Sequence, residues 1–173
     1  MKQYILVLII SSAAIHAHEV KPPLAKKSTN YQEKTVNALQ AILAPLQQKI
    51  NEVTGSNDLD LKLTMPNAQE DGSITLHNPY LSFNADIWYE GNRRELFIQE
   101  IEVDPLHRGK GIGSTCIKCF DNPKAARLLN YAVIRLNSYP KSCNFYKKLG
   151  FSCPRIHKEK EPLYEFKKKI TIK

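Results

Sequence analysis

The sequence contains few of the residues on which several classes of protein depend. Four of its 173 residues are cysteine, too few for a domain built around disulfides. It has no internal repeat and no low-complexity tract, and its strongly apolar run at residues 4–10 is too short to span a membrane. With 42% hydrophobic and 24% charged residues, it is not a disordered chain. We therefore expect one globular domain with a real core.

The cysteines give little sign of redox or metal chemistry. Cys116 and Cys119 have the C-x-x-C spacing, but a redox pair stands at the very start of a helix, where the dipole lowers the thiol pKa. Here a glycine-rich loop takes that place. A zinc site would need a second pair at similar spacing, and Cys143 and Cys153 lie too far apart in the sequence. We predict buried apolar cysteines and no metal, while disulfide pairing stays open.

Acidic residues are the scarcer charged type, with 17 Asp and Glu against 25 Lys and Arg, so the net charge is +8. This balance favours anionic partners such as phosphates, nucleic acid or acidic membranes. A basic, soluble surface accounts for it equally well. No motif specific for nucleic acid is present, and the oligomeric state cannot be read from the sequence.

The first residues have the layout of a secretory signal peptide. Lys2 precedes the apolar run, and small residues lead to a candidate cleavage site after Ala17. We predict residues 1–17 as a signal peptide and the protein as exported or secreted. An uncleaved anchor or a misassigned start is the alternative, with a membrane-anchored or cytoplasmic protein. Residues 18–30 are predicted as a polar linker and residues 31–173 as the domain, with its core at 59–170.

An apolar stripe predicts a first helix that packs on a sheet. Thr29 or Asn30 is expected to cap its start and Gly55 to close its end. Pro45 is expected to kink the helix or split it in two. The stripe recurs at steps of three and four residues and consists of Val36, Leu39, Leu43, Leu46, Ile50 and Val53.

Beyond this helix, alternating apolar residues predict a mixed α/β domain around one sheet. Four strands lead into the glycine-rich loop and a helix that breaks early, at Asp121-Asn122-Pro123. Residues 121–130 are expected to form a loop with room for one helical turn. The predicted strands cover residues 59–65, 73–78, 80–89, 95–103, 131–137, 151–156 and 163–172, and the later helices residues 113–120 and 141–150.

The stretch "VDPLHRGKGIGST", residues 103–115, predicts an anion-binding site. A strand that runs through a glycine loop into a helix leaves unpaired N–H groups at the helix N-terminus, where they bind phosphate oxygens. Glycine lets the anion approach without a Cβ in the way, and Arg108 and Lys110 add positive charge. We expect a pyrophosphate over residues 109–114.

Two well-known glycine loops do not fit these residues. In a Walker A loop the lysine follows the last glycine, whereas Lys110 precedes Gly111. The dinucleotide fingerprint G-x-G-x-x-G does not fit either, because the third glycine is missing whether the motif starts at Gly109 or at Gly111. The pattern R/Q-x-x-G-x-G/A fits, with Arg108, Gly111 and Gly113 at its fixed positions.

That pattern resembles the pyrophosphate loop of the GNAT N-acetyltransferase superfamily. A second family signature, F-Y-x-x-L-G-F, follows at residues 145–151, and the resemblance covers about residues 59–170. It implies an α/β GNAT fold, with a single mixed, mostly antiparallel central sheet splayed between its fourth and fifth strands and flanked by helices. It also implies acetyl-CoA as co-substrate, with the pantetheine arm lying in the splay like an added strand.

The resemblance implies roles for individual residues. Glu100 is expected to act as general base, with Glu102 as second choice, and Tyr146 to protonate or stabilise the leaving thiolate. A solvated strand carboxylate and a core aromatic are the respective alternatives. Tyr139 stands where relatives often carry an asparagine. The residues expected to bind the co-substrate are Ile101, Val103, Arg108, Gly109, Lys110, Gly111, Ile112, Gly113, Ser114 and Asn137.

The function implied is an acyl-CoA-dependent N-acyltransferase that transfers acetyl from acetyl-CoA to a primary amine by direct attack. The amine, on a small molecule or a protein, is unidentified. Acetyl-CoA is a cytosolic metabolite, so an exported enzyme would be separated from its co-substrate. Delivery into another cell's cytosol or an anchor facing inward would resolve the conflict. The third resolution is an exported, non-catalytic CoA-binding or interaction module, which is the alternative function.

Overall fold

The computed structural model describes residues 25–64, 72–90, 93–157 and 163–171, so the predicted signal peptide lies outside the described residues. No helix in these ranges is both long and apolar enough to cross a membrane. The elements are α1 (Ala25–Thr54), β1 (Asp60–Thr64), β2 (Gly72–Asn78), β3 (Leu81–Glu90), β4 (Arg93–Val103), η1 (Pro105–His107), α2 (Ile112–Phe120), α3 (Pro123–Leu129), β5 (Val133–Ser138), η2 (Pro140–Ser142), α4 (Cys143–Lys148), β6 (Ser152–His157) and β7 (Leu163–Lys169).

The first helix is longer than the sequence predicted. It begins at Ala25, so the predicted cap at Thr29 or Asn30 is wrong and residues 25–30 belong to the helix rather than to a linker. The reason is local, because Ala and Lys favour helix and no proline or glycine occurs between Pro23 and Pro45. The helix also runs through Pro45 without splitting. Its predicted end is confirmed, since Gly55 has a φ of +75° and donates its N–H to Asn51 O at 2.8 Å.

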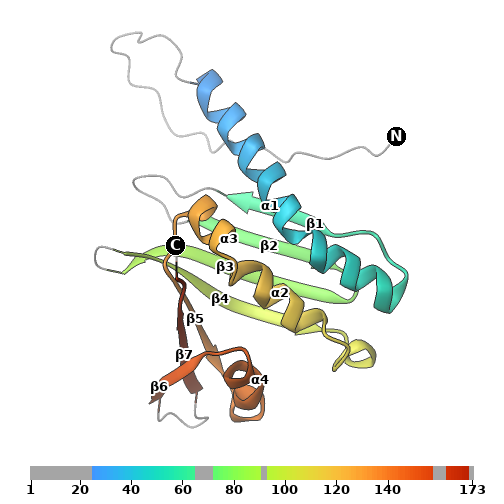
Figure 1. Ribbon diagram of the computed structural model, residues 1–173, viewed down its shortest axis with the longest axis vertical. Coiled ribbons are helices and arrows are strands. Elements are labelled where there is room, and N and C mark those ends of the chain that lie inside the picture. The colour runs from blue at the N-terminus through green and yellow to red at the C-terminus, as the bar shows by residue number, and fades with distance from the viewer. Residues whose placement is uncertain (1–24, 65–71, 91–92, 158–162, 172–173) are drawn as a thin grey trace, which may run out of the picture.

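The seven strands form one mixed sheet in the order β1-β2-β3-β4-β5-β7-β6. Every neighbouring pair is antiparallel except β4 and β5, which are parallel. Figure 1 shows α1, α2 and α3 lying across β1–β4, while β5, β6, β7 and α4 form a smaller part that turns away from it. This is the single mixed, mostly antiparallel sheet that the sequence predicted.

The core lies between the helices and one face of the sheet. The stripe on α1 is confirmed, because Leu39, Leu43, Leu46 and Ile50 are at most 2% exposed. Below the helices, the ring of Phe83 on β3 stacks on that of Phe120 on α2, with 4.7 Å between centroids. Burial of these side chains is the main force that fixes the helices on the sheet.

The helix after the glycine loop breaks where predicted, at residues 121–122, but the chain then forms a second helix instead of a loop. Asn122 caps α3 by accepting from the Lys124 N–H, and Pro123 takes the first helical position. Asn130 ends it in the left-handed conformation, with a φ of 56°. Buried Ala125, Ala126 and Leu129 on α3 provide the packing that a loop would lack, which is the signal the sequence reading missed.

Burial determines the protonation state of the two thiols of the C-x-x-C pair. Cys116 and Cys119 are buried within α2, and burial raises the pKa of the Cys116 thiol well above its usual value. Both thiols are therefore protonated and apolar, as predicted. Cys143 and Cys153 are half-buried.

Candidate functional site

Strands β4 and β5 separate part of the way along their length. Their parallel pairing runs from Glu95 and Val133 to Ile98 and Leu136 and then stops. A bulge in β4 accompanies the separation, because Asn84 and Ala85 of β3 face Glu100 and Ile98, which leaves Gln99 as the extra residue. A bulge bends a strand and increases its twist, so β4 leaves β5 at this point (Figure 1). The predicted splay between the fourth and fifth strands is confirmed.

The backbone groups of β4 beyond the bulge face the gap at alternate residues. Asp104 donates its N–H to Tyr80 O on the β3 side at 3.1 Å. Because an antiparallel strand directs the groups of successive residues to opposite sides, those of Ile101 and Val103 point toward β5. These are the two residues expected to bind pantetheine. The side chain of Arg108 already uses one of these groups, since its Nε donates to Val103 O at 2.9 Å.

At the end of β4, the glycine loop presents the bare N-terminus of α2. Gly111 occupies the capping position with a φ of 93°, and no side chain caps the helix. The first intrahelical bond runs from Thr115 N to Gly111 O. The amides of Ile112, Gly113 and Ser114 therefore lie before the hydrogen-bonded part of the helix, as an anion site requires. Gly109 also has a positive φ, 78°, so both loop glycines adopt a backbone conformation that other residues rarely take.

Asp104 fixes the start of the loop. Its carboxylate accepts from the Leu106 N–H at 2.9 Å and contacts His107 Nδ1 at 2.8 Å. The hydrogen bond from His107 lowers the pKa of Asp104, so this carboxylate remains an acceptor. The imidazole packs edge-on against Tyr80, at 4.8 Å between centroids. The "DPLH" segment is thus a rigid support for the glycines that follow.

Of the two cations expected at the loop, Arg108 is held by β4. Arg108 points back along β4, with its guanidinium 3.5 Å from Glu102 and 59% of its side chain exposed. Lys110 is exposed. A third cation comes from α1, because Lys49 Cε lies 3.3 Å from the position that a Cβ on Gly111 would take. No sequence pattern connects Lys49 to a loop sixty residues later, so the sequence reading missed it.

Lys49 is expected to strengthen binding of a phosphate at this loop. Its ammonium group is 3.1 Å from Glu52, which competes for it. We predict that Lys49→Gln weakens acetyl-CoA binding about two- to fivefold, the effect of one partly exposed charge pair, and that Glu52→Gln leaves binding unchanged or tightens it. Calorimetric titration at low and high salt measures both. A Lys49→Gln affinity equal to that of the wild type at low salt would exclude this role.

Glu100 stands just beyond the bulge, on the face of β4 that points away from the helices. It is exposed, and its Oε2 accepts from Asn84 Nδ2 at 2.8 Å and lies 3.5 Å from Ser82 Oγ. Both partners come from β3, the neighbouring strand. They fix the orientation of the carboxylate without neutralising its charge, and the register β3–β4 that brings them together was not readable from the sequence.

Tyr146 lies on the other side of the gap, on α4. It is 7% exposed and packs against Phe145, Phe151 and Phe166, with 4.9–5.9 Å between ring centroids. Burial, with a smaller contribution from Cys116, raises the pKa of Tyr146 to about 12. Within the described residues, no hydrogen bond engages its hydroxyl. The residue is therefore part of the core and also carries a free, protonated donor.

The end of β5 completes the gap. Asn137 and Ser138 continue to pair with β7, at Glu165 and Tyr164, but no longer with β4. Asn137 is exposed there, and so is Tyr139 with 51% of its side chain accessible. The structure thus brings Ile101, Val103, Glu100 and the loop glycines to one end of β4. Asn137 stands on β5 beyond the pairing of the two strands, and the side chain of Arg108 is held by β4.

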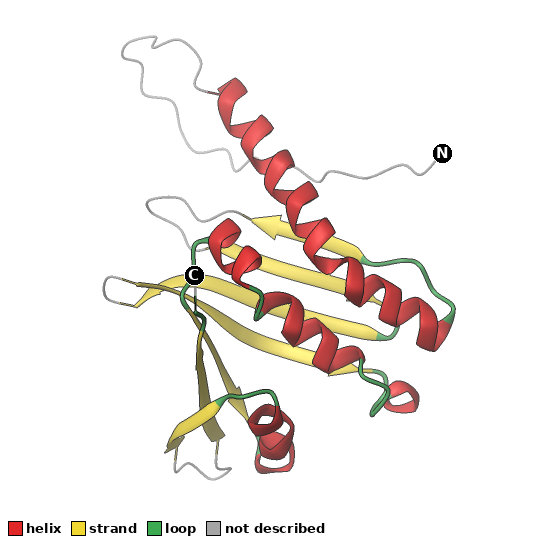
Figure 2. Cartoon of the chain, in the orientation of Figure 1, coloured by secondary structure: helices red, strands yellow, loops and turns green. Residues whose placement is uncertain are grey.

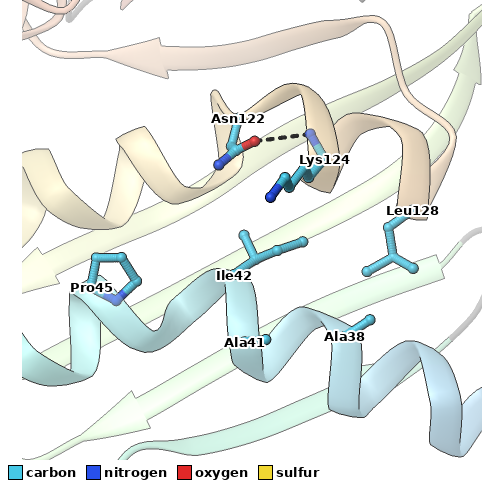
Figure 3. A pocket seen from close by; sticks show the side chains of 7 residues that line it. All are labelled: Ala38, Ala41, Ile42, Pro45, Asn122, Lys124 and Leu128. Carbon is cyan, nitrogen blue, oxygen red and sulfur yellow. Dashed lines mark hydrogen bonds between the residues drawn. The ribbon is translucent and has the colours of Figure 1, made fainter.

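A separate groove lies on the helical side of the molecule. Its volume is about 430 Å³, and Figure 3 shows it between α1 and α3, with Ile42 and Leu128 facing each other across it. It adjoins the C-terminal end of α2, about 13 Å of helix from the glycine loop. It is no part of the gap. The lining residues are Ala38, Ala41, Ile42, Pro45, Asn122, Lys124 and Leu128.

Comparison with known proteins agrees with this geometry. Residues 76–153 match the family model described as the acetyltransferase (GNAT) domain, and this range includes β4, the glycine loop, α2 and α4. No curated protein matches the chain. The sheet order, the single parallel pair, the splay and the family match together define an α/β GNAT fold. Residues 76–153, less than half of the chain, thus match the GNAT domain model, and the chain has the GNAT fold.

Several solved structures are similar to the chain at low identity. Arabidopsis thaliana Naa50, in complex with a bisubstrate analogue, is 19% identical with a TM-score of 0.46, over 56% of this chain and 71% of its own. Ard1 from Thermoplasma volcanium is 19% identical with a TM-score of 0.45, over 57% and 70%. The spermidine/spermine N-acetyltransferase SpeG from Vibrio cholerae is 18% identical with a TM-score of 0.46, over 59% and 66%.

Proposed function

We propose that the protein transfers an acetyl group from acetyl-CoA to an amine by direct attack. The observation that carries this proposal is the coincidence of two features at one end of β4. The pairing of β4 with β5 stops at Ile98, so β5 does not pair with β4 at Ile101 and Val103, and the uncapped amides of α2 follow directly. In the proposed complex the pyrophosphate rests on these amides, and the pantetheine lies along Ile101 and Val103.

The chemistry assigns a proton acceptor and a proton donor. A lysine-like amine has a pKa near 10.4, so about one molecule in a few thousand is neutral at pH 7, and a base is needed. Glu100 removes the proton, directly or through water. The amine nitrogen then forms its bond to the thioester carbonyl carbon, and the bond from that carbon to sulfur breaks. Tyr146 donates a hydrogen bond or a proton to the departing thiolate.

Tyr146→Phe is predicted to lower kcat about 10²-fold, the lower end of the range for a general acid, with little change in affinity for acetyl-CoA. The ring keeps its packing, so the fold should persist. Because the pKa of Tyr146 is about 12, the hydroxyl stays protonated throughout the accessible range. The wild-type rate should therefore not fall between pH 8 and about 10. An unaltered kcat in the variant would leave Tyr146 as a packing residue.

The activity is tested by mixing the purified protein with acetyl-CoA and a panel of primary amines and measuring release of free thiol. We expect saturable binding of acetyl-CoA and turnover with at least one amine. Binding without turnover on any amine would favour the non-catalytic module. Absence of binding at millimolar acetyl-CoA would remove the proposal altogether.

We further propose that residues 1–17 direct export. The support is the order of Lys2, the apolar run and the small residues before Ala17. N-terminal sequencing of the protein from its native host should begin at His18. A sequence that begins at Met1 would contradict cleavage after Ala17 and would leave an uncleaved anchor or a cytoplasmic protein as the alternatives.

A further inference from the structure

The sheet has one face that no described helix covers. Residues directly opposite each other on neighbouring strands share a face, so Leu76, Phe83 and Ile101 line the helical side. Across β5 and β7 the same side continues through Leu136 and Phe166, against which Tyr146 of α4 packs. All four helices therefore lie on one side of the sheet, as Figure 2 shows for α1, α2 and α3 over β1–β4.

We call the opposite side of β1–β4, in the three rows that contain Glu102, Glu100 and Asp86, the open face. The buried side chains of β2 and β3 alternate with half-buried or exposed ones that point to this face. Within the residues that the structure describes, only side chains of the sheet itself shield it. The open face adjoins the gap, because Glu100 belongs to both.

The open face is anionic on a protein whose net charge is +8. Its three rows carry the carboxylates of Asp60, Asp86, Glu100 and Glu102 against one lysine and one histidine. Two of the four are paired, Asp60 with Lys62 at 3.9 Å and Glu102 with Arg108 at 3.5 Å. Two of the carboxylates are held by neutral amides. Gln99 Nε2 donates to Asp86 at 2.7 Å, and Asn84 donates to Glu100 at 2.8 Å. Among the described residues, neither of these two forms an ion pair, so their charge remains available to a partner.

The spacing of these carboxylates matches an extended chain. Glu100 occupies the middle row, with Glu102 in the row on one side and Asp86 in the row on the other. Alternate residues of a strand lie about 7 Å apart, and an extended peptide has the same repeat. A lysine placed at Glu100 would thus have its neighbours two residues away near Glu102 and Asp86. A small amine has no such neighbours and would use one carboxylate of the three.

We propose that the open face binds the acceptor, and that the acceptor is an extended basic polypeptide whose target lysine is flanked by cations at alternate positions. This inference rests on the proposed function, since it names the acceptor for the same site. Charge complementarity supplies affinity and register, and the face is open enough for a segment of a larger protein. A polyamine is the competing small cation, and it is an outcome of the test.

The test compares acetyl transfer to four acceptors. Two are short peptides with blocked N-termini and one lysine, flanked at alternate positions by arginine or by glutamine. The others are spermidine and butylamine. We expect kcat/KM for the arginine peptide to exceed that for the glutamine peptide about tenfold, as for a favourable charge pair at each end, and to exceed that for spermidine. Equal values for the two peptides, or a preference for spermidine, would overturn the proposal.

A matched pair of variants locates the effect. Asp86→Lys reverses a charge on the open face, and Glu33→Lys reverses one on exposed α1, with the same change in net charge. Asp86→Lys should abolish the preference for the arginine peptide, whereas Glu33→Lys should leave that preference intact. Loss of the preference in both variants, or in neither, would contradict a site on the open face.

A direct binding measurement separates this proposal from the proposed function. Fluorescence anisotropy of the labelled arginine peptide needs no acetyl-CoA. Peptide binding that Asp86→Lys weakens about tenfold, without any acetyl transfer, would support the open face and refute the enzyme. Transfer to butylamine without any peptide preference would support the enzyme and refute the open face.

Discussion

Replacing Gly111 by alanine is expected to weaken acetyl-CoA binding tenfold or more while the protein still folds. Gly111 has a φ of 93°, and an L-residue in this region is strained by about 1–2 kcal/mol. A Cβ there would also approach Lys49 Cε at 3.3 Å. We expect the loop to relieve this strain by moving the amides that would bind the phosphates. A loss of about 1.4 kcal/mol in binding free energy lowers the affinity for acetyl-CoA tenfold.

Gly113→Ala is the matched control for this prediction. Gly113 lies within α2 at an ordinary helical φ, and its Cβ would meet Val103, Ile101 and Phe145 at 3.5–3.8 Å, which is normal packing. Alanine also favours helix over glycine by about 1 kcal/mol. We expect the Gly113→Ala protein to be at least as stable as the wild type and to bind acetyl-CoA within about threefold. Calorimetric titration of both variants measures the difference, and equal losses would show that the loop conformation is irrelevant.

The second large effect concerns Glu100. Glu100→Gln keeps an oxygen that can accept from Asn84 but cannot take a proton, so we expect kcat to fall about 10²–10⁴-fold. The acceptor deprotonates by itself as the pH approaches its own pKa of about 10.4. The ratio of the wild-type kcat to the kcat of Glu100→Gln should therefore fall as the pH rises from 7 to 10. Steady-state rates over that range, with saturating acetyl-CoA, give the profile.

Glu102→Gln tests whether Glu100 or its neighbour Glu102 acts as the general base. Glu102 lies two residues further along β4 on the same face and is 3.5 Å from Arg108. We expect this variant to raise KM for a basic acceptor and to leave kcat within about threefold, the range of one exposed charge. A fall in kcat as large as that of Glu100→Gln would transfer the role of base to Glu102, and unaltered kcat in both would remove it from this strand.

Local patterns predicted the parts of the site that are local in the chain. The glycine loop and the first turn of α2 are contiguous in the sequence, and their glycines and cations were recognisable there. The seven strands were predicted for the same reason, because alternation is a short-range signal. The splay was implied by resemblance alone, and the bulge at Gln99 that accompanies it has no signature in the residues around it.

The parts that the sequence did not predict depend on distant contacts. Lys49 reaches the loop because α1 packs beside α2, and Asn84 meets Glu100 because of the β3–β4 register. Arg108 was expected to face phosphate, but its side chain contacts Val103 O and the carboxylate of Glu102, which come from the β4 backbone and its open side. α3 forms because its alanines and leucine are buried, and burial depends on the whole fold.

The central claim is that backbone amides at the entrance of α2 hold the phosphates of an acyl-CoA. Calorimetric titration of the purified protein with acetyl-CoA and with S-acetylpantetheine, which lacks those phosphates, tests it most directly. Two or more charge-assisted hydrogen bonds, each about 1.5–3 kcal/mol, predict that acetyl-CoA binds at least about a hundredfold more tightly. Equal affinities for the two compounds, or no saturable binding of acetyl-CoA, would contradict the account.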